Sequence, residues 1–229
     1  MQWQGQKAIS GFSRNRDRGN LGSVTDPDET RPGPETILPV YEREAAGWAR
    51  GRVRDLWEAP ALEATVAGRA PGLSVLDLGC GAGMPIAGWY LARGDGVTGV
   101  DGAAAMVAEA RRAVPAMEAL HADMRGLDLR RRFDVILGFN SVFHLSPDDQ
   151  RAMFQVFERH SARGARLLLT TGPAASETWG RVGASVVYHA SLDPAEYRAL
   201  FGDHGFDVLW FRPEDPEFRG HSVWLAEAR

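Results

Sequence analysis

The sequence contains one cysteine, no apolar run of membrane-spanning length and no long stretch of lysine and arginine. The single cysteine, Cys80, excludes an internal disulfide framework and a zinc site built from several cysteines. No segment approaches the roughly 18 apolar residues of a membrane helix. The N-terminal residues lack the apolar core of a signal peptide, so we expect a cytoplasmic protein. A net charge of −4 without a basic run argues against nucleic acid and membrane partners.

The overall composition fits an ordinary soluble globular protein. The chain has 229 residues, 44% of them hydrophobic and 24% charged, which is enough to bury a substantial core in one or two domains. Its 26 glycines indicate either many loops or a few positions where a ligand touches the backbone.

The chain divides into three segments. Residues 1–36 are rich in glycine and proline with isolated apolar residues, which is typical of a flexible arm. Residues 37–70 are predicted to form a helical cap in two parts, which Pro60 bends or divides. Residues 71–229 are predicted to form one α/β domain, with an irregular substrate insert around 172–190 whose centre is 174–188.

Short apolar runs alternate with amphipathic helices through most of this domain, which predicts a parallel sheet covered on both faces. The predicted strands are 73–78, 96–100, 117–121, 133–139 and 165–171, and the predicted helices are 85–93, 103–114, 147–160 and 193–201. Ser146 and Pro147 mark the start of the third of these helices. The last runs, 206–211 and 222–226, have no helix between them, which favours an antiparallel pair.

The most informative segment, VLDLGCGAGMP over residues 75–85, is a buried strand followed by a glycine-rich turn and a helix. A dinucleotide site needs a third glycine where this chain has Met84 or Ile86, depending on where the pattern starts. Asp77 immediately before the turn would repel a pyrophosphate and attract a cation. The segment therefore argues against a dinucleotide and for a positively charged cofactor.

The run from Asp77 to Gly83 closely resembles the first motif of the class I S-adenosylmethionine-dependent methyltransferases. The later strands carry similar motifs, each at a strand end. By this resemblance Asp101, 22 residues after Gly79, takes the ribose hydroxyls, and Asp123 reaches the adenine amino group. The segment 133–140 resembles the fourth motif, which leads to the reacting methyl group.

The resemblance implies a Rossmann-like, doubly wound sheet with strand order 3-2-1-4-5-7-6, strand 7 antiparallel, and S-adenosylhomocysteine as product. Residues 41–52 also resemble the segment before the first motif in small-molecule members, where a Tyr and an Arg fold over the cofactor. Ordinary packing of the aromatic residues is the alternative. The cofactor-binding residues that the resemblance implies are Tyr41, Trp48, Arg52, Asp77, Gly79, Cys80, Gly81, Gly83, Asp101, Gly102, Asp123, Met124, Phe139 and Asn140.

Methyl transfer from a sulfonium needs alignment and exclusion of water, and a general base only if the acceptor arrives protonated. The candidate catalytic residues are His144, His189 and Asn140. His144 follows the fourth strand and has a positional role as its alternative, while His189 adjoins the insert. His160, at a helix C-terminus, is interpreted as a structural imidazolium. His204 and His221 carry no specific signal.

The residues at the ends of the fourth and fifth strands narrow the range of acceptors. Residues 139–142 are Phe-Asn-Ser-Val rather than the Asn/Asp-Pro-Pro-aromatic motif of amino-methyltransferases acting on DNA and protein. Residues 170–172 supply no carboxylate for a metal. We therefore expect a metal-independent methyltransferase, a monomer or homodimer, acting on a small-molecule nucleophile. The alternatives are a macromolecule-directed methyltransferase, a cofactor-binding relative without transferase activity, and a relative that uses the sulfonium for other chemistry.

Overall fold

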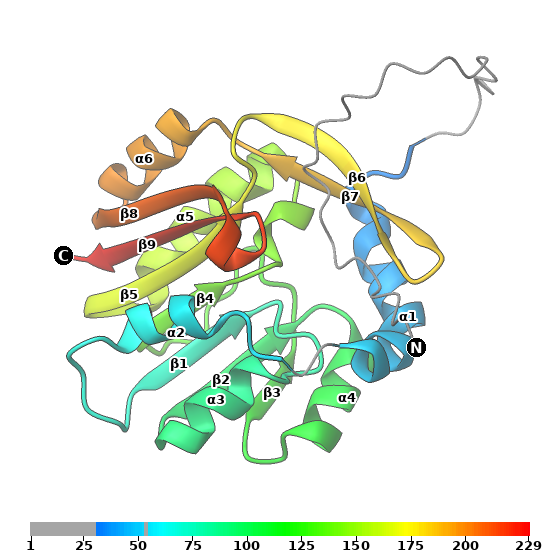
Figure 1. The fold of residues 1–229 in the computed structure, drawn as a ribbon, viewed down its shortest axis with the longest axis horizontal. Helices are drawn as coiled ribbons and strands as arrows, with labels where there is room; N and C mark the ends of the chain where they lie inside the picture. Colours follow the sequence, from blue (N-terminus) through cyan, green and yellow to red (C-terminus); the bar gives the residue numbers. More distant parts are fainter. Residues whose placement is uncertain (1–30, 53–54) are drawn as a thin grey trace.

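A seven-stranded sheet forms the centre of the computed structural model, which describes residues 31–52 and 55–229 (Figure 1). Its strand order is β3-β2-β1-β4-β5-β9-β8. The strands are β1 Ser74–Leu78, β2 Gly96–Asp101, β3 Glu118–His121, β4 Phe133–Gly138, β5 Ser161–Thr171, β8 Phe206–Asp215 and β9 His221–Ala228. The first five are parallel and β9 is antiparallel to both its neighbours, so the predicted order and the single antiparallel strand are confirmed.

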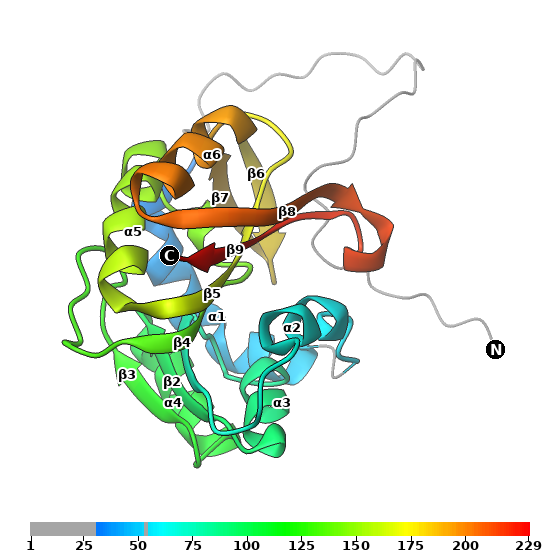
Figure 2. The same ribbon diagram turned by 90° about the vertical axis from the view of Figure 1, so that its left-hand side faces the viewer.

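Helices cover both faces of this sheet, because strands buried on two sides need an apolar layer on each. The covering helices are α2 Ala59–Val66, α3 Ile86–Arg93, α4 Ala104–Ala113, α5 Pro147–His160 and α6 Pro194–Asp203. One core cluster joins the sheet to α5 and α6, and a second joins it to α2, α3 and α4. Figure 2 shows α5 and α6 on the opposite side of the sheet from α2 and α3.

The structure confirms the predicted helix boundaries where the sequence contains recognisable capping residues. Ser146 caps α5 by accepting a hydrogen bond from the Asp149 amide at 3.1 Å, and Pro147 occupies the first turn. Pro60 lies in the first turn of α2, so it divides the cap into α2 and α1 Ile37–Gly51 rather than bending one helix.

The segment predicted to be irregular, 174–188, is mostly regular, and that prediction is wrong. It forms a β-hairpin of β6 Ser176–Val182 and β7 Ser185–Ser191, a two-stranded sheet apart from the main one. Gly183, with φ 57°, supplies the left-handed turn residue. The hairpin packs on α1 through a small core of Ile37, Val40, Val182, Val187, Tyr188 and Ala190, and the two elements lie side by side in Figure 1.

Most of the predicted flexible arm, residues 1–30, lies outside the described residues. Its last six residues contact the hairpin. The carbonyl of Pro32 accepts a hydrogen bond from the Trp179 indole at 2.9 Å, and the Arg31 guanidinium lies 4.7 Å from the Trp179 ring centroid. The short helix Pro34–Thr36 then leads into α1.

Candidate active site

The glycine-rich turn after β1 is held by backbone geometry that only glycine adopts easily. Gly79, Gly81 and Gly83 have φ values of 78°, 54° and 79°. A Cβ at Gly79 would lie 2.3 Å from the Ser141 Cβ, and one at Gly83 would lie 3.0 Å from the Met117 Cε. A Cβ at Gly81 would meet only the Trp48 Nε1 at 3.7 Å. Two of the glycines therefore allow close packing, whereas a Cβ at Gly81 would make only an ordinary contact with Trp48.

Two adjoining cavities lie at the carboxyl ends of the central strands, where the strand order reverses between β1 and β4. The larger has a volume of about 500 Å³ and the smaller about 140 Å³. The residues that line both are Tyr41, Trp48, Gly79, Gly81, Asn140 and His144. The structure therefore brings together the cap helix, the glycine loop and the end of β4, as the sequence predicted.

Asp77, the residue before the last of β1, lies in the wall of the larger cavity and is 3% exposed. No described residue donates a hydrogen bond to its carboxylate. Burial raises the pKa of Asp77 to about 7, with a further rise from Asp101 and an opposing effect of Arg52. An uncompensated carboxyl group in a cavity wall is a site for a cation.

Asp101, at the end of β2, ties the glycine loop to the next helix. Its Oδ2 accepts from the Gly81 amide at 2.8 Å and its Oδ1 from the Ala103 amide at 2.9 Å. Burial raises the pKa of the Asp101 carboxyl group, and these two amide hydrogen bonds oppose the rise. The carboxylate lines the smaller cavity together with Gly102.

Asp123 and Met124 lie at the rim of the smaller cavity, beyond β3. Asp123 accepts hydrogen bonds from the Arg125 amide at 2.9 Å and from the Arg125 Nη2 at 2.6 Å. Desolvation acts to raise the pKa of Asp123, but the hydrogen bonds from Arg125 outweigh it and hold the pKa below its usual range. The carboxylate is thus ionised and half exposed at the rim.

Asn140 is a polar residue with an unsatisfied buried atom at the junction of the two cavities. The φ of Asn140 is 55°, and its backbone amide donates a hydrogen bond to the Thr170 Oγ1 at 2.6 Å. Its side-chain Oδ1 is buried without a hydrogen-bond partner among the described residues. A buried acceptor without a donor costs free energy, so a ligand group is the expected partner.

His144 is buried and both of its ring nitrogens are occupied. Nδ1 lies 2.8 Å from the Tyr188 carbonyl, to which it donates, so Nε2 accepts from the Tyr41 hydroxyl at 2.8 Å. The ring is therefore neutral, and burial lowers the pKa of His144 to about 3. This histidine fixes Tyr41 over the cavities.

His189, on β7, packs against the rings of Phe143 and His144 at centroid distances of 4.9 and 4.8 Å. It lines the larger cavity and has no hydrogen bond to a described residue through its ring nitrogens. Burial lowers the pKa of His189 to about 4, so the ring is neutral near pH 7. Its nitrogens are available to a ligand.

The remaining cofactor residues predicted from the sequence also lie in the walls, except Gly83, which lines neither cavity and packs against Met117 and Val114. Arg52 lines the larger cavity and pairs with Glu58, which is fully buried and whose Oε2 has no partner among the described residues. Phe139 lies 5.8 Å from the Trp57 ring. The Cys80 side chain packs against Gly99, and burial, reinforced by Asp77, raises the pKa of its thiol.

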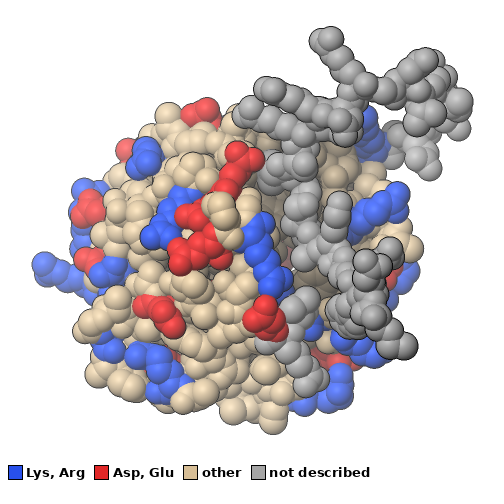
Figure 3. Space-filling model, viewed as in Figure 1, with Lys and Arg blue, Asp and Glu red and all other residues tan. Residues whose placement is uncertain are grey.

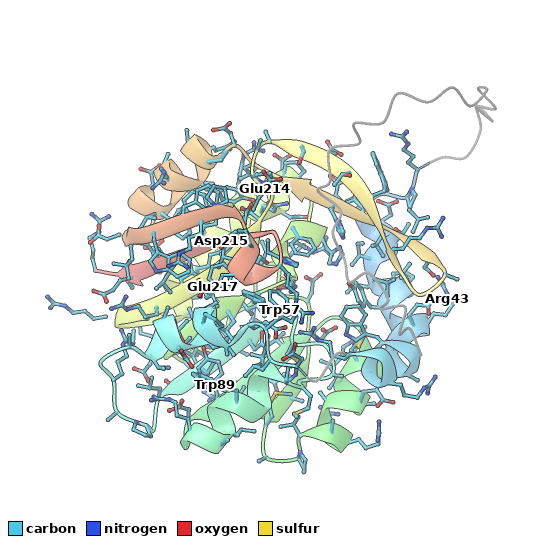
Figure 4. The ribbon with its side chains drawn as sticks, viewed as in Figure 1. Arg43, Trp57, Trp89, Glu214, Asp215 and Glu217 are labelled. Carbon is cyan, nitrogen blue, oxygen red and sulfur yellow. The ribbon has the colours of Figure 1, made fainter. Side chains whose placement is uncertain are left out.

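The larger cavity is also lined by residues that were not predicted from the sequence, and four of these carry a charge, an imidazole or an indole: Trp57, Arg181, Arg219 and His221. His221 stacks on Trp57 with ring centroids 4.8 Å apart, and its Nδ1 donates to the Phe218 carbonyl at 2.8 Å. Figure 4 shows Trp57 beside the turn between β8 and β9. These residues come from the cap, the hairpin and the last turn, and only the fold brings them together.

His160 is structural, but it is not the imidazolium that its helix position predicted. Its Nε2 accepts from the Leu129 amide at 3.0 Å, and its Nδ1 donates to the Val156 carbonyl at 2.8 Å. A ring that accepts at one nitrogen is neutral. Here a buried hydrogen bond outweighs the attraction of the helix C-terminus for a positive charge.

Over the part of the chain that the structure describes, no three histidine, cysteine, aspartate or glutamate residues gather in a way that could hold a metal ion. Within the same residues, no helix combines the length and apolar character needed to cross a membrane.

Comparison with known proteins gives one family match and many matches of fold. Residues 75–164 match the family model described as a methyltransferase domain. No curated protein matches. An amino pentose methyltransferase of calicheamicin biosynthesis from Micromonospora echinaspora, solved with S-adenosylmethionine, has 22% identity and a TM-score of 0.64 over 82% of this chain and 96% of its own.

Two further structures are similar to the same extent. The magnesium protoporphyrin IX methyltransferase of Synechocystis PCC 6803, also solved with S-adenosylmethionine, has 21% identity and a TM-score of 0.63, covering 87% of this chain and 99% of its own. A glycopeptide N-methyltransferase has 18% identity and a TM-score of 0.62, covering 76% and 94%. The similarity to these structures establishes a shared fold, and the domain match covers the glycine loop and Asp101. Residues 75–164 therefore match a methyltransferase domain, and the chain shares the fold of methyltransferases that were solved with S-adenosylmethionine.

Proposed function

We propose that this chain is an S-adenosylmethionine-dependent methyltransferase that acts, without a metal, on an O, N, C or S nucleophile of a small molecule, as a cytoplasmic monomer or homodimer, and releases S-adenosylhomocysteine. The observation that carries the proposal is the larger cavity, about 500 Å³, which adjoins the smaller one beneath α1 and the hairpin. Pockets of this size suit small molecules. A macromolecular acceptor would need an open basic groove, and the cavity beneath α1 and the hairpin favours a small molecule instead.

The residues present fit S-adenosylmethionine. Asp77 has a carboxyl group without a donor, Asn140 has a buried acceptor without a donor, and Gly81 leaves room against the backbone. When bound, the cofactor supplies a sulfonium methyl group that is already activated for displacement. By the family resemblance, Asp77 would face the ammonium group, Asp101 the ribose and Asp123 the adenine. Contributions from the other residues are proposed from their place in the walls: Tyr41, Trp48, Arg52, Gly79, Cys80, Gly81, Gly102, Met124, Phe139 and Asn140. Gly83 lines neither cavity, so we propose that it acts through the packing of the loop on Met117.

The side chains of the cap and hairpin would align the acceptor and exclude water from it. Trp48 and Tyr41 of α1 and Val182 and Val187 of the hairpin line the larger cavity. Of the two predicted base candidates, His189 is favoured because its nitrogens are unoccupied, while both nitrogens of His144 are engaged. We therefore propose His189 as proton acceptor and His144 as the residue that positions Tyr41.

Replacing His189 with glutamine is expected to lower kcat by about 10²-fold on an acceptor that must lose its proton, with cofactor affinity unchanged. Because the pKa of His189 is lowered to about 4, the wild-type kcat at saturating cofactor should be flat from pH 6 to 9 and fall only as the pH approaches 4. Turnover and S-adenosylmethionine titrations measure both effects. His204→Gln, on a partly buried histidine that pairs with Glu158 and lines neither cavity, is the control. Unchanged turnover of H189Q would exclude this residue as the base.

Replacing Asp101 with alanine is expected to weaken S-adenosylmethionine binding by roughly 1–3 kcal/mol, because charge-assisted hydrogen bonds and the partner of the Gly81 amide are lost. Calorimetric titration measures the change. Asp128→Ala is the matched control, since Asp128 accepts a hydrogen bond from the Arg130 amide in an exposed turn. Equal affinity in D101A and the wild type would show that the ribose assignment is wrong.

The acceptor class is tested by incubating the protein with methyl-labelled S-adenosylmethionine and separate pools of small metabolites, RNA, DNA and peptides. Label in the small-molecule pool supports the proposal. Label confined to RNA, DNA or peptide would contradict it, and no transfer with bound cofactor would favour a binding protein.

A further inference from the structure

Two arginines that line the larger cavity come from outside the motifs that were assigned to the cofactor. They are Arg181 of β6 and Arg219 of the last turn. Asp77, at the cofactor end, is the only carboxylate among the lining residues that the structure describes. We propose that the methyl acceptor is a planar aromatic molecule that carries a carboxylate, held by Arg181 and Arg219; this inference rests on the proposed small-molecule function.

The two arginines differ in their partners, and both have capacity for an anion. Arg181 donates to the Ala184 carbonyl at 3.3 Å and has no carboxylate partner among the described residues. Arg219 pairs with Asp55 at 2.9 Å, but that carboxylate is 73% exposed, so water screens the pair. Guanidinium groups bind carboxylates through paired hydrogen bonds, which makes arginine the residue suited to this task. A buried carboxylate of the acceptor would compete well with exposed Asp55.

The walls beside the arginines are aromatic, which accounts for a planar body. Trp57 stacks on His221 and lies 5.8 Å from the Phe139 ring. The Arg219 guanidinium lies 5.6 Å from the Trp57 ring centroid, so the positive charge and the aromatic wall adjoin each other. An aromatic acid offers a ring to these walls and a charge to the arginine.

The backbone conformation of Arg219 is a second indication that this side chain has a role in ligand binding. Its φ is 52°, a left-handed conformation that a residue with a Cβ rarely adopts, and Gly220 follows with φ 80°. Such conformations cluster at ligand sites, where the surrounding structure over-determines them. Here the turn directs the guanidinium over Trp57.

The acidic residues of the neighbouring turn lie outside this cavity. Glu214, Asp215 and Glu217 gather at the turn between β8 and β9, where Figure 4 labels them, and Figure 3 shows a patch of acidic side chains on this face. Arg212 pairs with two of them, Asp215 at 3.7 Å and Glu217 at 2.6 Å. The other nearby acids are also engaged, Glu177 with the Tyr188 hydroxyl and Glu44 with Ser185. None of these acidic residues lines the larger cavity, so they do not neutralise the charge of Arg181 and Arg219 within it.

The test uses a matched pair of probes, 2-naphthoate and 2-naphthamide, which share a shape and differ in charge. Each is titrated into the full chain, with and without saturating S-adenosylhomocysteine, and tryptophan fluorescence reports binding. We expect the carboxylate to bind about tenfold or more tightly than the amide. R181Q and R219Q should each reduce this preference, and R151Q, on an exposed arginine of α5, should leave it unchanged.

Equal or stronger binding of the amide, no binding of either probe at millimolar concentration, or a preference that survives R181Q and R219Q together would overturn the proposal. A loss of S-adenosylhomocysteine affinity in R219Q with the preference retained would also overturn it, because Arg219 would then belong to the cofactor. Separate measurements would show that the proposed function itself is wrong. In that case the protein would not bind S-adenosylhomocysteine or would not transfer a methyl group, whichever of the two probes binds more tightly.

Discussion

Replacing Asp77 with asparagine is expected to weaken S-adenosylmethionine binding by about 10- to 100-fold at pH 8, and to make the ligand-free protein more stable. The first effect follows from losing the one carboxylate that lines the larger cavity among the described residues. The second follows because this carboxyl group is buried without a hydrogen-bond donor in the free protein, and ionising it there is unfavourable.

The direction of the pH dependence follows from the raised pKa of Asp77, about 7 against an ordinary 3.8. Between these values the folded protein holds a proton that the unfolded chain has lost, so stability falls as the pH rises from about 4 to 7. Above pH 7 the loss is complete, and D77N avoids it. The gain at pH 8 is on the order of 1–3 kcal/mol. A cationic ligand favours the ionised form, so wild-type affinity should rise with pH up to about 7.

Asp134→Asn is the control for this result, because Asp134 is another carboxylate beside β1 with a structural task. It accepts from the Ser74 amide at 2.8 Å and the Ser74 hydroxyl at 2.7 Å. D134N should lose stability and keep its cofactor affinity. Thermal unfolding and calorimetry measure both variants. An unchanged affinity in D77N would contradict the assignment of Asp77 to the ammonium group.

The second large effect is a difference between alanine substitutions at two glycines of the same loop, one of which should lower stability and the other cofactor affinity. Gly79→Ala is expected to destabilise the fold by roughly 2–4 kcal/mol, because its Cβ would lie 2.3 Å from the Ser141 Cβ in a left-handed conformation. Gly81→Ala should cost only about 1 kcal/mol of backbone strain, since its Cβ would meet no atom closer than the Trp48 Nε1 at 3.7 Å. G81A should nevertheless lose at least about tenfold in cofactor affinity, because the methyl group occupies the room left for the ligand.

Urea unfolding and S-adenosylmethionine titration of the two variants give the comparison. The expected pattern is a marked loss of stability in G79A and a loss of affinity without a matching loss of stability in G81A. If G81A binds the cofactor as the wild type does, the cofactor does not approach the backbone at Gly81. A G79A protein as stable as the wild type would contradict the close packing of the loop on Ser141.

The sheet and the glycine loop were predictable because their signals are local. Strands buried on both faces produce short apolar runs such as 133–138, and the loop produces glycines at positions where φ is positive. The hairpin was missed because its first strand carries Glu177, Gly180 and Arg181, which is typical of a loop. Its regular structure comes from packing on α1 and not from local preference.

The roles of the histidines depended on contacts that no sequence spacing reveals. His144 was predicted beside the cavity, but its two nitrogens are occupied by groups 103 and 44 positions away, Tyr41 and Tyr188. His221 carried no signal because it begins a strand, and only the antiparallel course of β9 returns it to Trp57. The sequence thus predicted which residues lie at the site where they belong to a recognisable motif. It did not predict the hydrogen bonds that these residues make.

The choice of a sulfonium cofactor at the Asp77 carboxylate is decided by calorimetric titration of the free protein with S-adenosylmethionine at pH 6 and pH 8. We expect one site per chain, stronger binding at pH 8, and release of up to one proton at pH 6 that disappears in D77N. NAD should give no heat under the same conditions. Binding of NAD with no response to S-adenosylmethionine or S-adenosylhomocysteine would show that the glycine loop serves a dinucleotide and that the sulfonium assignment is wrong.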